Sequence, residues 1–474
     1  MKVRTRIAPS PTGDPHIGTL YQAIFDYAFA KKNNGEFILR IEDTDRERFV
    51  AGSEENIINS LKWAGINPDE GPFNKGDFAP YRQSERLDIY KKYIYKLIED
   101  KKAYYCFCTK ERLDDLRQKQ IQNKIQSKYD KFCLSLPQEE IKNNLENKKS
   151  HVIRLNVTQG EEIIFTDLIR GDIKINTDNI DDQIIMKSDG FPTYHAAVVI
   201  DDHLMKITHI IRGEEWISST PKHILLYKAF EWNIPYFAHL SLLRNRDKSK
   251  IAKRESHTSI NWYRDNGYLP EALINYLILL GWSHPDDKEI FSMNEFISKF
   301  SFERVNKGGP IFDLDKLTWM NGVYIRSKSI QDIKKYIKPY LKYDIENQKL
   351  ENILKLVQDR LKIFSEINSL IDFFCETPNI NINEITENFS IDIVKEILEK
   401  TIDILDKNGI NHDSEKMLRD YAESQEYNIG NFFMVIRLAI TGKKATPPLI
   451  ETMDIIGIDD IKKRILTVIN YDGR

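Results

Sequence analysis

The stretch APSPTGDPHIGT, residues 8–19, decides the fold. Its prolines restrict the backbone, and it joins a strand-like segment (VRTRIA, 3–8) to an apolar segment with helical spacing (TLYQAIFDYAFAKK, 19–32). The sequence therefore predicts a strand, a rigid loop and a helix. A glycine-containing loop that opens a helix is a general means of holding phosphate, because the free N–H groups and the dipole at the helix start favour an anion.

Three residues of this loop suit a nucleotide. Gly18 has no side chain to block a close approach, and His16 and Thr19 supply hydrogen-bond donors beside a phosphate. The alternative is that proline, glycine and serine form a plain turn with a surface histidine beside it. Short motifs give many false positives, so the loop alone leaves both interpretations open.

The residues after the first helix continue an α/β pattern. Gly35 is expected to end that helix, EFILRIED (36–43) is typical of a buried strand, and EENIINSLKWAG (54–65) is typical of a second helix. A strand–helix–strand order favours a parallel, Rossmann-like sheet.

The remainder of the chain divides into segments that differ in composition and in hydrophobic pattern. Residues 104–185 combine a polar, lysine- and glutamine-rich stretch with short strand-like pieces, which predicts an α+β insertion; the sheet is expected to resume over 191–216. After about residue 325 the pattern is helical. Ser390 is a candidate N-cap and Gly409 a candidate stop for one such helix. Its apolar stripe is Val394, Ile397, Leu398, Ile402 and Leu405.

Composition excludes several classes of protein. The chain has 474 residues, 30% charged and 41% hydrophobic, which is typical of a globular protein of about three domains. A net charge of −3 gives no general reason to expect nucleic acid, so such a partner must be argued from local patches. Four cysteines suit a reducing compartment. The opening residues have no signal-peptide pattern, and the most apolar run (273–282) is too short for a bilayer, so we expect a cytoplasmic protein without a membrane segment.

A second segment rich in cations is LLRNRDKSKIAKRES, residues 242–256. Most charge runs are solvated surface, but a lysine-rich loop would also neutralise a polyphosphate while one P–O bond breaks and another forms. Its basic residues are Arg244, Arg246, Lys248, Lys250, Lys253 and Arg254.

Taken together, these segments resemble a known family. APSPTGDPHIGT resembles the His-Ile-Gly-His signature of class I aminoacyl-tRNA synthetases, and KIAKR (250–254) is similar to their lysine-rich signature. Five further blocks resemble bacterial glutamyl-tRNA synthetases: FILRIEDTD (37–45), YRQSERLDIY (81–90), KSDGFPTYH (187–195), IRGEEWISSTP (211–221) and FDLDKLTWMNGVYIR (312–326). The match is dense over residues 3–326 and stays in register beyond them.

The resemblance implies a fold class and a division of the chain. The fold is an α/β Rossmann-like parallel-sheet catalytic domain with an α+β insertion, followed by an all-α C-terminal half. The implied parts are a catalytic domain (1–103 and 186–240), a connective insertion that grips the tRNA acceptor end (104–185), a stem-contact region with the KIAKR loop (241–326) and an anticodon-binding region (327–474).

The resemblance also implies a reaction and an amino-acid site. ATP activates L-glutamate to glutamyl-adenylate, and the acyl group then passes to the 3′ end of tRNA(Glu). Arg6, Arg212 and Tyr194 would bind carboxylate, Glu42 the ammonium group and Ser10 the α-carboxylate. A purely structural role is the alternative for each of these residues. For example, Arg6 and Glu42 could form an ion pair between neighbouring strands, and Tyr194 could be a core residue.

The implied nucleotide site uses both signatures. The ATP-binding residues are His16, Gly18, Thr19, Trp216, Lys250, Lys253 and Arg254, of which His16, Thr19, Lys250 and Lys253 are the candidate catalytic residues. Mg²⁺ is expected with ATP, bound largely through the phosphates.

Three positions depart from the family pattern. Ala252 replaces the usual serine of the basic loop, and Val198 stands where many members have an asparagine. Cys106, Cys108 and Cys133 resemble a zinc knuckle, but Ser135 occupies the fourth position and is a poor zinc ligand. We therefore predict isolated cysteines and no structural zinc.

The resemblance leaves the acceptor RNA open. Arg360 falls where discriminating members check the third anticodon letter, which would favour tRNA(Glu) over tRNA(Gln). Lys462, Lys463 and Arg464 form a candidate phosphate-binding patch. The alternatives are a non-discriminating enzyme, a nucleotidyltransferase of the same superfamily that needs no RNA, and a non-catalytic RNA-binding relative. The expected partners are tRNA(Glu), L-glutamate and ATP, and the expected state is a monomer.

Overall fold

A computed structural model describes residues 2–45, 48–74, 76–249, 251 and 258–471. The chain forms two compact units, one of residues 1–263 with 273–313 and the other of residues 264–272 with 314–474. The predicted stem-contact region, 241–326, thus contributes to both units. The four-part division of the chain stays a prediction.

The first unit is built on parallel strands, as predicted. β1 (Arg4–Ile7) pairs with β2 (Glu36–Leu39), and β8 (His209–Gly213) pairs with β9 (Tyr236–Leu240), both in parallel. The N–H of Thr208 donates to the carbonyl of Arg4, which places β8 beside β1. The parallel order β9-β8-β1-β2 is the core of a Rossmann-like sheet.

The expected insertion contributes strands to two sheets. β5 (Glu162–Asp167) runs parallel to β9 and carries β6 (Gly171–Asn176) antiparallel at the edge of the same sheet. The remaining strands form a separate antiparallel sheet: β3 (Ala103–Cys106), β4 (Val152–Leu155) and β7 (Ile184–Met186).

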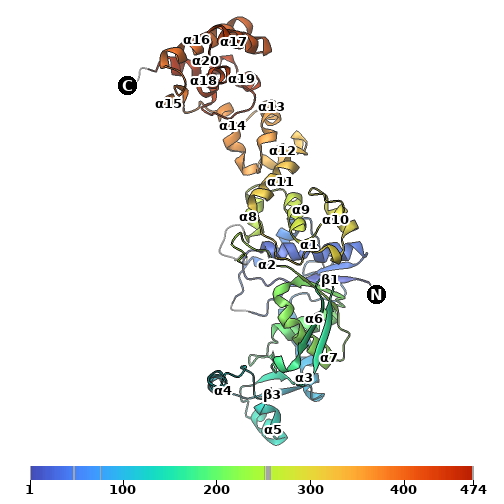
Figure 1. Ribbon diagram of the computed structural model, residues 1–474. Coiled ribbons are helices and arrows are strands. Elements are labelled where there is room, and N and C mark those ends of the chain that lie inside the picture. The colour runs from blue at the N-terminus through green and yellow to red at the C-terminus, as the bar shows by residue number, and fades with distance from the viewer. Residues whose placement is uncertain (1, 46–47, 75, 250, 252–257, 472–474) are drawn as a thin grey trace. The chain divides into compact units, whose positions relative to one another are not determined.

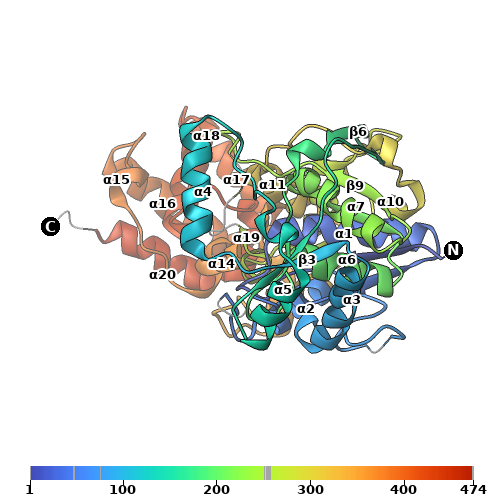
Figure 2. The same ribbon diagram turned by 90° about the horizontal axis from the view of Figure 1, so that it is seen from below.

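Helices cover both faces of the parallel sheet (Figure 1). α1 and α10 lie on one face, where Phe25 packs edge-to-face on Phe296 and Phe300. α3, α6 and α7 lie on the other, and Figure 2 shows α3 beside α6. The helices up to residue 299 are α1 (Ile17–Lys32), α2 (Ser53–Trp63), α3 (Leu87–Glu99), α4 (Lys110–Gln122), α5 (Gln138–Glu146), α6 (Tyr194–Leu204), α7 (Thr220–Ala229), α8 (Ile260–Asp265), α9 (Pro270–Gly281) and α10 (Met293–Lys299).

A buried carboxylate fixes α6 against α3. Asp201 of α6 accepts hydrogen bonds from Arg86 Nε at 2.7 Å, from Gln83 Nε2 at 2.9 Å and from the Tyr90 hydroxyl at 2.8 Å. A buried charge is tolerable only when it is paired and hydrogen-bonded, so this set locks the helix whose first turn reaches the site.

The two ends of α1 show how the residues expected to begin and end this helix act in the structure. His16 is the N-cap, because its Nδ1 accepts from the Gly18 N–H at 2.9 Å. The helix ends at Lys32, and Asn34, not Gly35, has the left-handed backbone (φ 51°). Gly35 is required for a different reason: a Cβ there would collide with the carbonyl oxygen of Val3.

All regular secondary structure in the described residues of the second unit is helical, as predicted. Ser390 Oγ caps α16 by accepting from the Ile393 N–H, and Gly409 ends that helix with φ 75°. The predicted stripe of α16 is buried, apart from the half-buried Ile402. The helices from residue 314 onward are α11 (Leu314–Arg326), α12 (Ile330–Ile337), α13 (Asn347–Val357), α14 (Ile367–Cys375), α15 (Ile382–Ile385), α16 (Ile391–Asn408), α17 (His412–Ser424), α18 (Ile429–Thr441), α19 (Leu449–Ile456) and α20 (Ile458–Ile469).

In the part of the chain that the structure describes, no helix has both the length and the apolarity that crossing a bilayer requires.

Replacing Gly35 tests the close packing at the start of the sheet. The Gly35→Ala variant should lose about 1–3 kcal/mol of stability, because its methyl group forces Val3 and β2 apart. Each kcal/mol lowers the midpoint of thermal unfolding by about 2–4 °C. Gly308→Ala is the matched control, since nothing lies within 4 Å of a Cβ there. Equal midpoints for the two variants would contradict the packing argument.

Candidate active site

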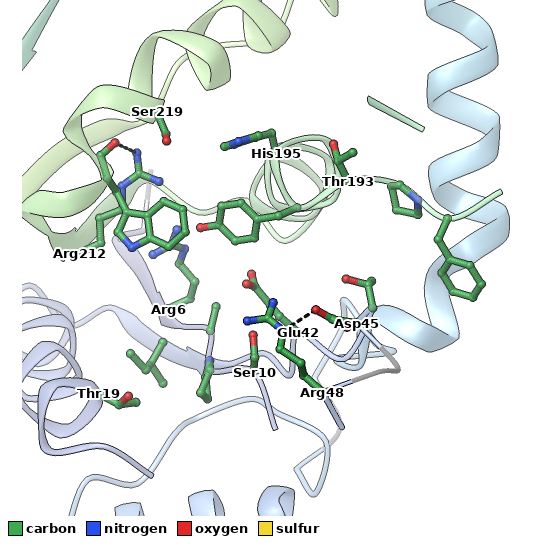
Figure 3. Close-up of a pocket in the computed structure, with 18 of the residues that line it drawn as sticks. Arg6, Ser10, Thr19, Glu42, Asp45, Arg48, Thr193, His195, Arg212 and Ser219 are labelled. Carbon is green, nitrogen blue, oxygen red and sulfur yellow. Dashed lines mark hydrogen bonds and ion pairs between the residues drawn. The ribbon is translucent and has the colours of Figure 1, made fainter. Parts of the chain in front are cut away.

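A cavity of about 1120 Å³ opens where the strands of the parallel sheet end. Ligands bind at the carboxyl edge of such sheets. All five residues expected to hold the amino acid line this cavity: Arg6, Ser10, Glu42, Tyr194 and Arg212. Figure 3 shows Arg6, Glu42 and Arg212 directed toward a common space, with His195 on its other side.

Arg6 and Glu42 have partners that the sequence did not suggest. Arg6 forms a two-pronged pair with Asp202, at 3.1 and 3.2 Å, and Glu42 accepts from Arg40 at 3.1 Å. Arg40 also donates to Asp202 at 2.7 Å. The alternative of a direct Arg6–Glu42 ion pair between strands is therefore wrong. Asp202 holds two arginines, and Arg40 positions Glu42 at the cavity wall.

Burial raises the pKa values of two groups in the cavity wall. It raises the pKa of Glu42 to about 7, although the charges of Arg40 and Arg6 oppose the change. Burial likewise raises the pKa of Tyr194 to about 12, and the Glu42 charge adds to that effect. Tyr194 is therefore a neutral donor at physiological pH. The Glu42 carboxyl gains or loses its proton near pH 7.

Arg212 is buried without a carboxylate partner. Its Nε donates to His239 Nε2 at 3.1 Å, and its terminal nitrogens donate to Thr220 Oγ1 at 2.8 Å and to His223 Nδ1 at 3.3 Å. Across the described ranges, no carboxylate lies within ion-pair distance of this guanidinium, which is 3% exposed. Burial lowers the pKa of Arg212 to about 10, so it stays charged at neutral pH. A buried and uncompensated cation makes the cavity a site for an anion.

A second cavity of about 520 Å³ adjoins the first and has the size of a small-molecule site. Thr19, Gln22 and Trp216 line both cavities, and His16 and Gly18 line the second. The structure therefore brings together the expected nucleotide residues that it describes. Gly18 has a role that the sequence did not reveal: a Cβ there would lie 3.0 Å from His16 Nδ1, so the glycine also makes room for the histidine cap.

The basic loop lies partly outside the described residues. Lys250, Ala252, Lys253 and Arg254 are among the residues that are not described, and their expected roles stay predictions. Ile251 lines the second cavity. Beyond the loop, Ser259 forms an antiparallel bridge with His16.

The prediction of isolated cysteines is wrong. Cys106, Cys108 and Cys133 converge, with their sulfur atoms within 4.8 Å of one another. Ser135 does not join them, since its hydroxyl donates to the Phe132 carbonyl at 3.0 Å. The Tyr129 hydroxyl lies there instead, 3.4 Å from Cys106 Sγ and 3.3 Å from Cys108 Sγ.

Three thiols and one phenol make a donor set of the number that structural zinc requires. Because the cysteines converge, isolation of the thiols no longer argues against zinc binding. The absence of zinc stays a prediction. If zinc bound there, these side chains would hold it and it would brace the insertion.

The helical unit places the expected RNA-binding cations in two different ways. Arg360 is exposed at the end of a short 3₁₀ helix (Gln358–Arg360), and its charge adds to burial in lowering the pKa of Arg437. By contrast, Arg464 is 5% exposed and donates to backbone carbonyls, and Lys462 and Lys463 pair with Asp406 and Asp460. Arg464 is therefore structural, and a phosphate-binding role for Lys462 and Lys463 stays a prediction.

Val198 lies in the core, 1% exposed, and is absent from the residues found to line the cavity. The side chain that replaces the usual asparagine therefore packs rather than binds.

Sequence reasoning missed Arg40, Asp202 and His239. Arg40 and His239 are each flanked by apolar residues, whereas Asp202 follows the apolar run AAVVI within the polar triplet Asp201–His203. Charged residues are almost never fully buried unless they are paired. That pattern could have marked them, although it does not identify their partners.

Comparisons with known proteins agree with this arrangement. Residues 2–319 match the family of tRNA synthetases class I (E and Q), catalytic domain, and residues 332–469 match an anticodon binding domain. The chain is 42% identical to a glutamate–tRNA ligase of Clostridioides difficile (strain 630), with 99% of each chain covered. It is 45% identical to one of Acinetobacter baylyi, over 97% of this chain and 92% of the relative. It is also similar to the crystal structure of a glutamate tRNA ligase from Elizabethkingia meningosepticum in complex with its amino acid, with a TM-score of 0.92, 37% identity and 99% of each chain covered.

Glu42 provides a test of the electrostatics of the cavity. The Glu42 carboxyl should titrate near pH 7 in a carbon-13 NMR experiment, and the Glu42→Gln variant should lose that signal. Because the pKa in the folded protein lies above the ordinary value of 4.5, the folded state holds this proton more tightly than the unfolded state. Its contribution to stability is therefore complete below pH 4.5 and is lost as the pH rises to about 7.

The same reasoning fixes the sign of the stability change. Relative to Glu42→Gln, the free energy of unfolding of the unmodified protein should fall by about 3 kcal/mol over that pH interval. A Glu42 carboxyl that titrates at its ordinary pH would contradict this description of the site.

Proposed function

This chain belongs to the glutamate–tRNA ligases, and from that premise we propose how its own residues carry out the reaction. Such an enzyme joins L-glutamate to tRNA at the expense of ATP. In the first step an oxygen of the glutamate α-carboxylate bonds to the α-phosphorus, and pyrophosphate leaves. In the second, a hydroxyl of the terminal ribose attacks the acyl carbon, and AMP leaves.

The observation that carries the proposal is the uncompensated charge of Arg212 opposite Glu42 in one cavity. Glutamate brings two carboxylates and one ammonium group. Arg212 and the Tyr194 hydroxyl would bind the side-chain carboxylate together with Arg6, and Glu42 would bind the ammonium group. Ser10 would hold the α-carboxylate at the side of the cavity that also contains Thr19. Arg6 is already paired with Asp202, so Arg212 supplies most of the attraction.

The adjoining second cavity suits ATP. Thr19 and Trp216 belong to both walls, so an amino acid in the first cavity and a nucleotide in the second would meet beside them. His16, Thr19, Lys250 and Lys253 are proposed to stabilise the charge that develops on the phosphates. Magnesium would enter with ATP and offset part of the phosphate charge. The protein's contribution is to hold both reactants in place and to exclude water.

The helical unit supports RNA as a partner of this chain. The match of residues 332–469 to an anticodon binding domain disfavours a nucleotidyltransferase that acts without RNA. We propose tRNA(Glu) as the acceptor, with Arg360 at the anticodon and residues 104–185 at the acceptor end. The exposure of Arg360 supports this role, since its guanidinium is accessible to an RNA partner. We further propose that the enzyme acts as a monomer in the cytoplasm.

Glutamate-dependent exchange of pyrophosphate into ATP tests the proposal. Exchange should require glutamate and should rise sharply when tRNA(Glu) is added. The Arg212→Ala variant should lose about 100-fold or more in kcat/KM for glutamate, since it removes a buried charge partner of the substrate. Arg212→Lys should be intermediate, because it keeps the charge but not the planar fork. The KM for ATP and the thermal midpoint serve as controls.

Three outcomes of this experiment count against parts of the proposal. Absence of exchange under every condition would contradict the activity. Exchange that ignores tRNA would favour the RNA-independent alternative. Equal stimulation of exchange by tRNA(Glu) and tRNA(Gln) would point to a non-discriminating enzyme.

A further inference from the structure

A buried histidine–aspartate pair lies directly behind Arg212. His239 Nδ1 is 2.5 Å from Asp167 Oδ2, and both side chains are fully enclosed. Asp167 Oδ1 accepts from the backbone N–H groups of Ile169 at 3.0 Å and Arg170 at 2.9 Å. Burial raises the pKa of Asp167, but the hydrogen bonds from His239 and the backbone outweigh that effect and keep the pKa below its ordinary value.

These contacts fix the tautomer of His239. The ionised Asp167 can only accept, so Nδ1 of His239 carries the proton. Burial keeps the pKa of His239 below its ordinary value, so the ring is neutral and Nε2 is left as an acceptor. The Nε–H of Arg212 donates to that atom at 3.1 Å.

A second neutral imidazole holds the other side of the guanidinium. Arg212 has no acceptor atom, so His223 Nδ1 accepts from it at 3.3 Å, and His223 Nε2 must then carry a proton. That N–H donates to His195 Nδ1 at 2.9 Å. His195 lines the first cavity, and its remaining nitrogen, Nε2, is the one that carries the proton there.

Neutral acceptors and carboxylates have different consequences for an arginine in a binding site. Asp202 orients Arg6 and also offsets part of its charge. An imidazole nitrogen orients a guanidinium through a directed hydrogen bond and leaves its charge in place. In the same wall of the cavity, Arg212 is held in the second way only.

We propose that His239, oriented by Asp167, is a positioning residue that holds Arg212 toward the cavity while leaving its charge for the substrate side-chain carboxylate. The inference rests on the proposed function, in which Arg212 binds that carboxylate. It adds that the preference for glutamate over glutamine depends on two residues that do not touch the substrate.

Substitutions at His239 separate positioning from packing. The amide oxygen of Gln reaches the position of Nε2 and can accept from Arg212, so His239→Gln should keep the KM for glutamate within about 3-fold. His239→Leu fills the space but removes both contacts, and it should raise that KM by about 10- to 100-fold, with little change in the KM for ATP. His203→Leu is the matched control, because His203 stacks on Trp232 outside the cavity.

Asp167→Asn tests the tautomer. The amide oxygen of the new side chain is needed by the N–H groups of Ile169 and Arg170, so its N–H₂ group faces His239 Nδ1. His239 must then carry its proton on Nε2, against the Nε–H of Arg212. This variant should raise the KM for glutamate as much as His239→Leu does. In both variants, the ratio of kcat/KM for glutamate to that for glutamine should fall.

Nitrogen-15 NMR of histidine-labelled protein reads the tautomer of His239 in the unmodified protein itself. In the unmodified protein, His239 should show a protonated Nδ1 and an unprotonated Nε2, with its signals assigned by their loss in His239→Gln. The opposite tautomer, an unchanged KM in His239→Leu, or equal effects on glutamate and ATP would overturn the proposal. If the unmodified protein shows no glutamate-dependent exchange, the proposed function fails, whereas the tautomer measurement still tests the geometry.

Discussion

Three arginines are buried at one edge of the parallel sheet, and the neighbouring elements of the first unit are arranged around their charges. Burying a guanidinium is costly unless something compensates for it, and Arg6, Arg40 and Arg212 are each less than 4% exposed. Asp202 pairs with both Arg6 and Arg40, and Glu42 and Asp201 also pair with Arg40. Arg212 has only neutral partners among the described residues, so its compensation is left to a ligand.

The fold supplies the elements that this arrangement needs. Asp202 comes from α6, which Asp201 ties to α3, so a purely structural network sets the position of a site residue. Arg212 is at the end of β8, and the residue behind it, His239, is on the adjacent strand β9. The rigid loop before α1 forms the other wall, where Thr19 separates the cavity proposed for the amino acid from the one proposed for the nucleotide.

Local features of the fold could be predicted from the sequence, and long-range pairs could not. The strand and helix around the front loop and the helix from Ser390 to Gly409 follow from periodicity and capping, which act within a few residues. The five residues that the resemblance assigns to the amino acid line one cavity, and their binding roles stay predictions. The partners of those residues were missed, since Arg6 meets Asp202 across 196 residues of chain. The cysteine cluster was missed because Tyr129, not Ser135, folds back onto it, and periodicity carries no information on that fold.

The central claim is that a charge left uncompensated by the protein recognises the substrate, and a structure of the complex tests it most directly. Crystals grown with glutamate and a non-hydrolysable ATP analogue should show the glutamate side-chain carboxylate within hydrogen-bond distance of Arg212, with Arg212 still donating to His239 and the ammonium group at Glu42. A complex in which Arg212 has turned to a carboxylate of the protein, with the substrate side chain bound elsewhere, would contradict the account.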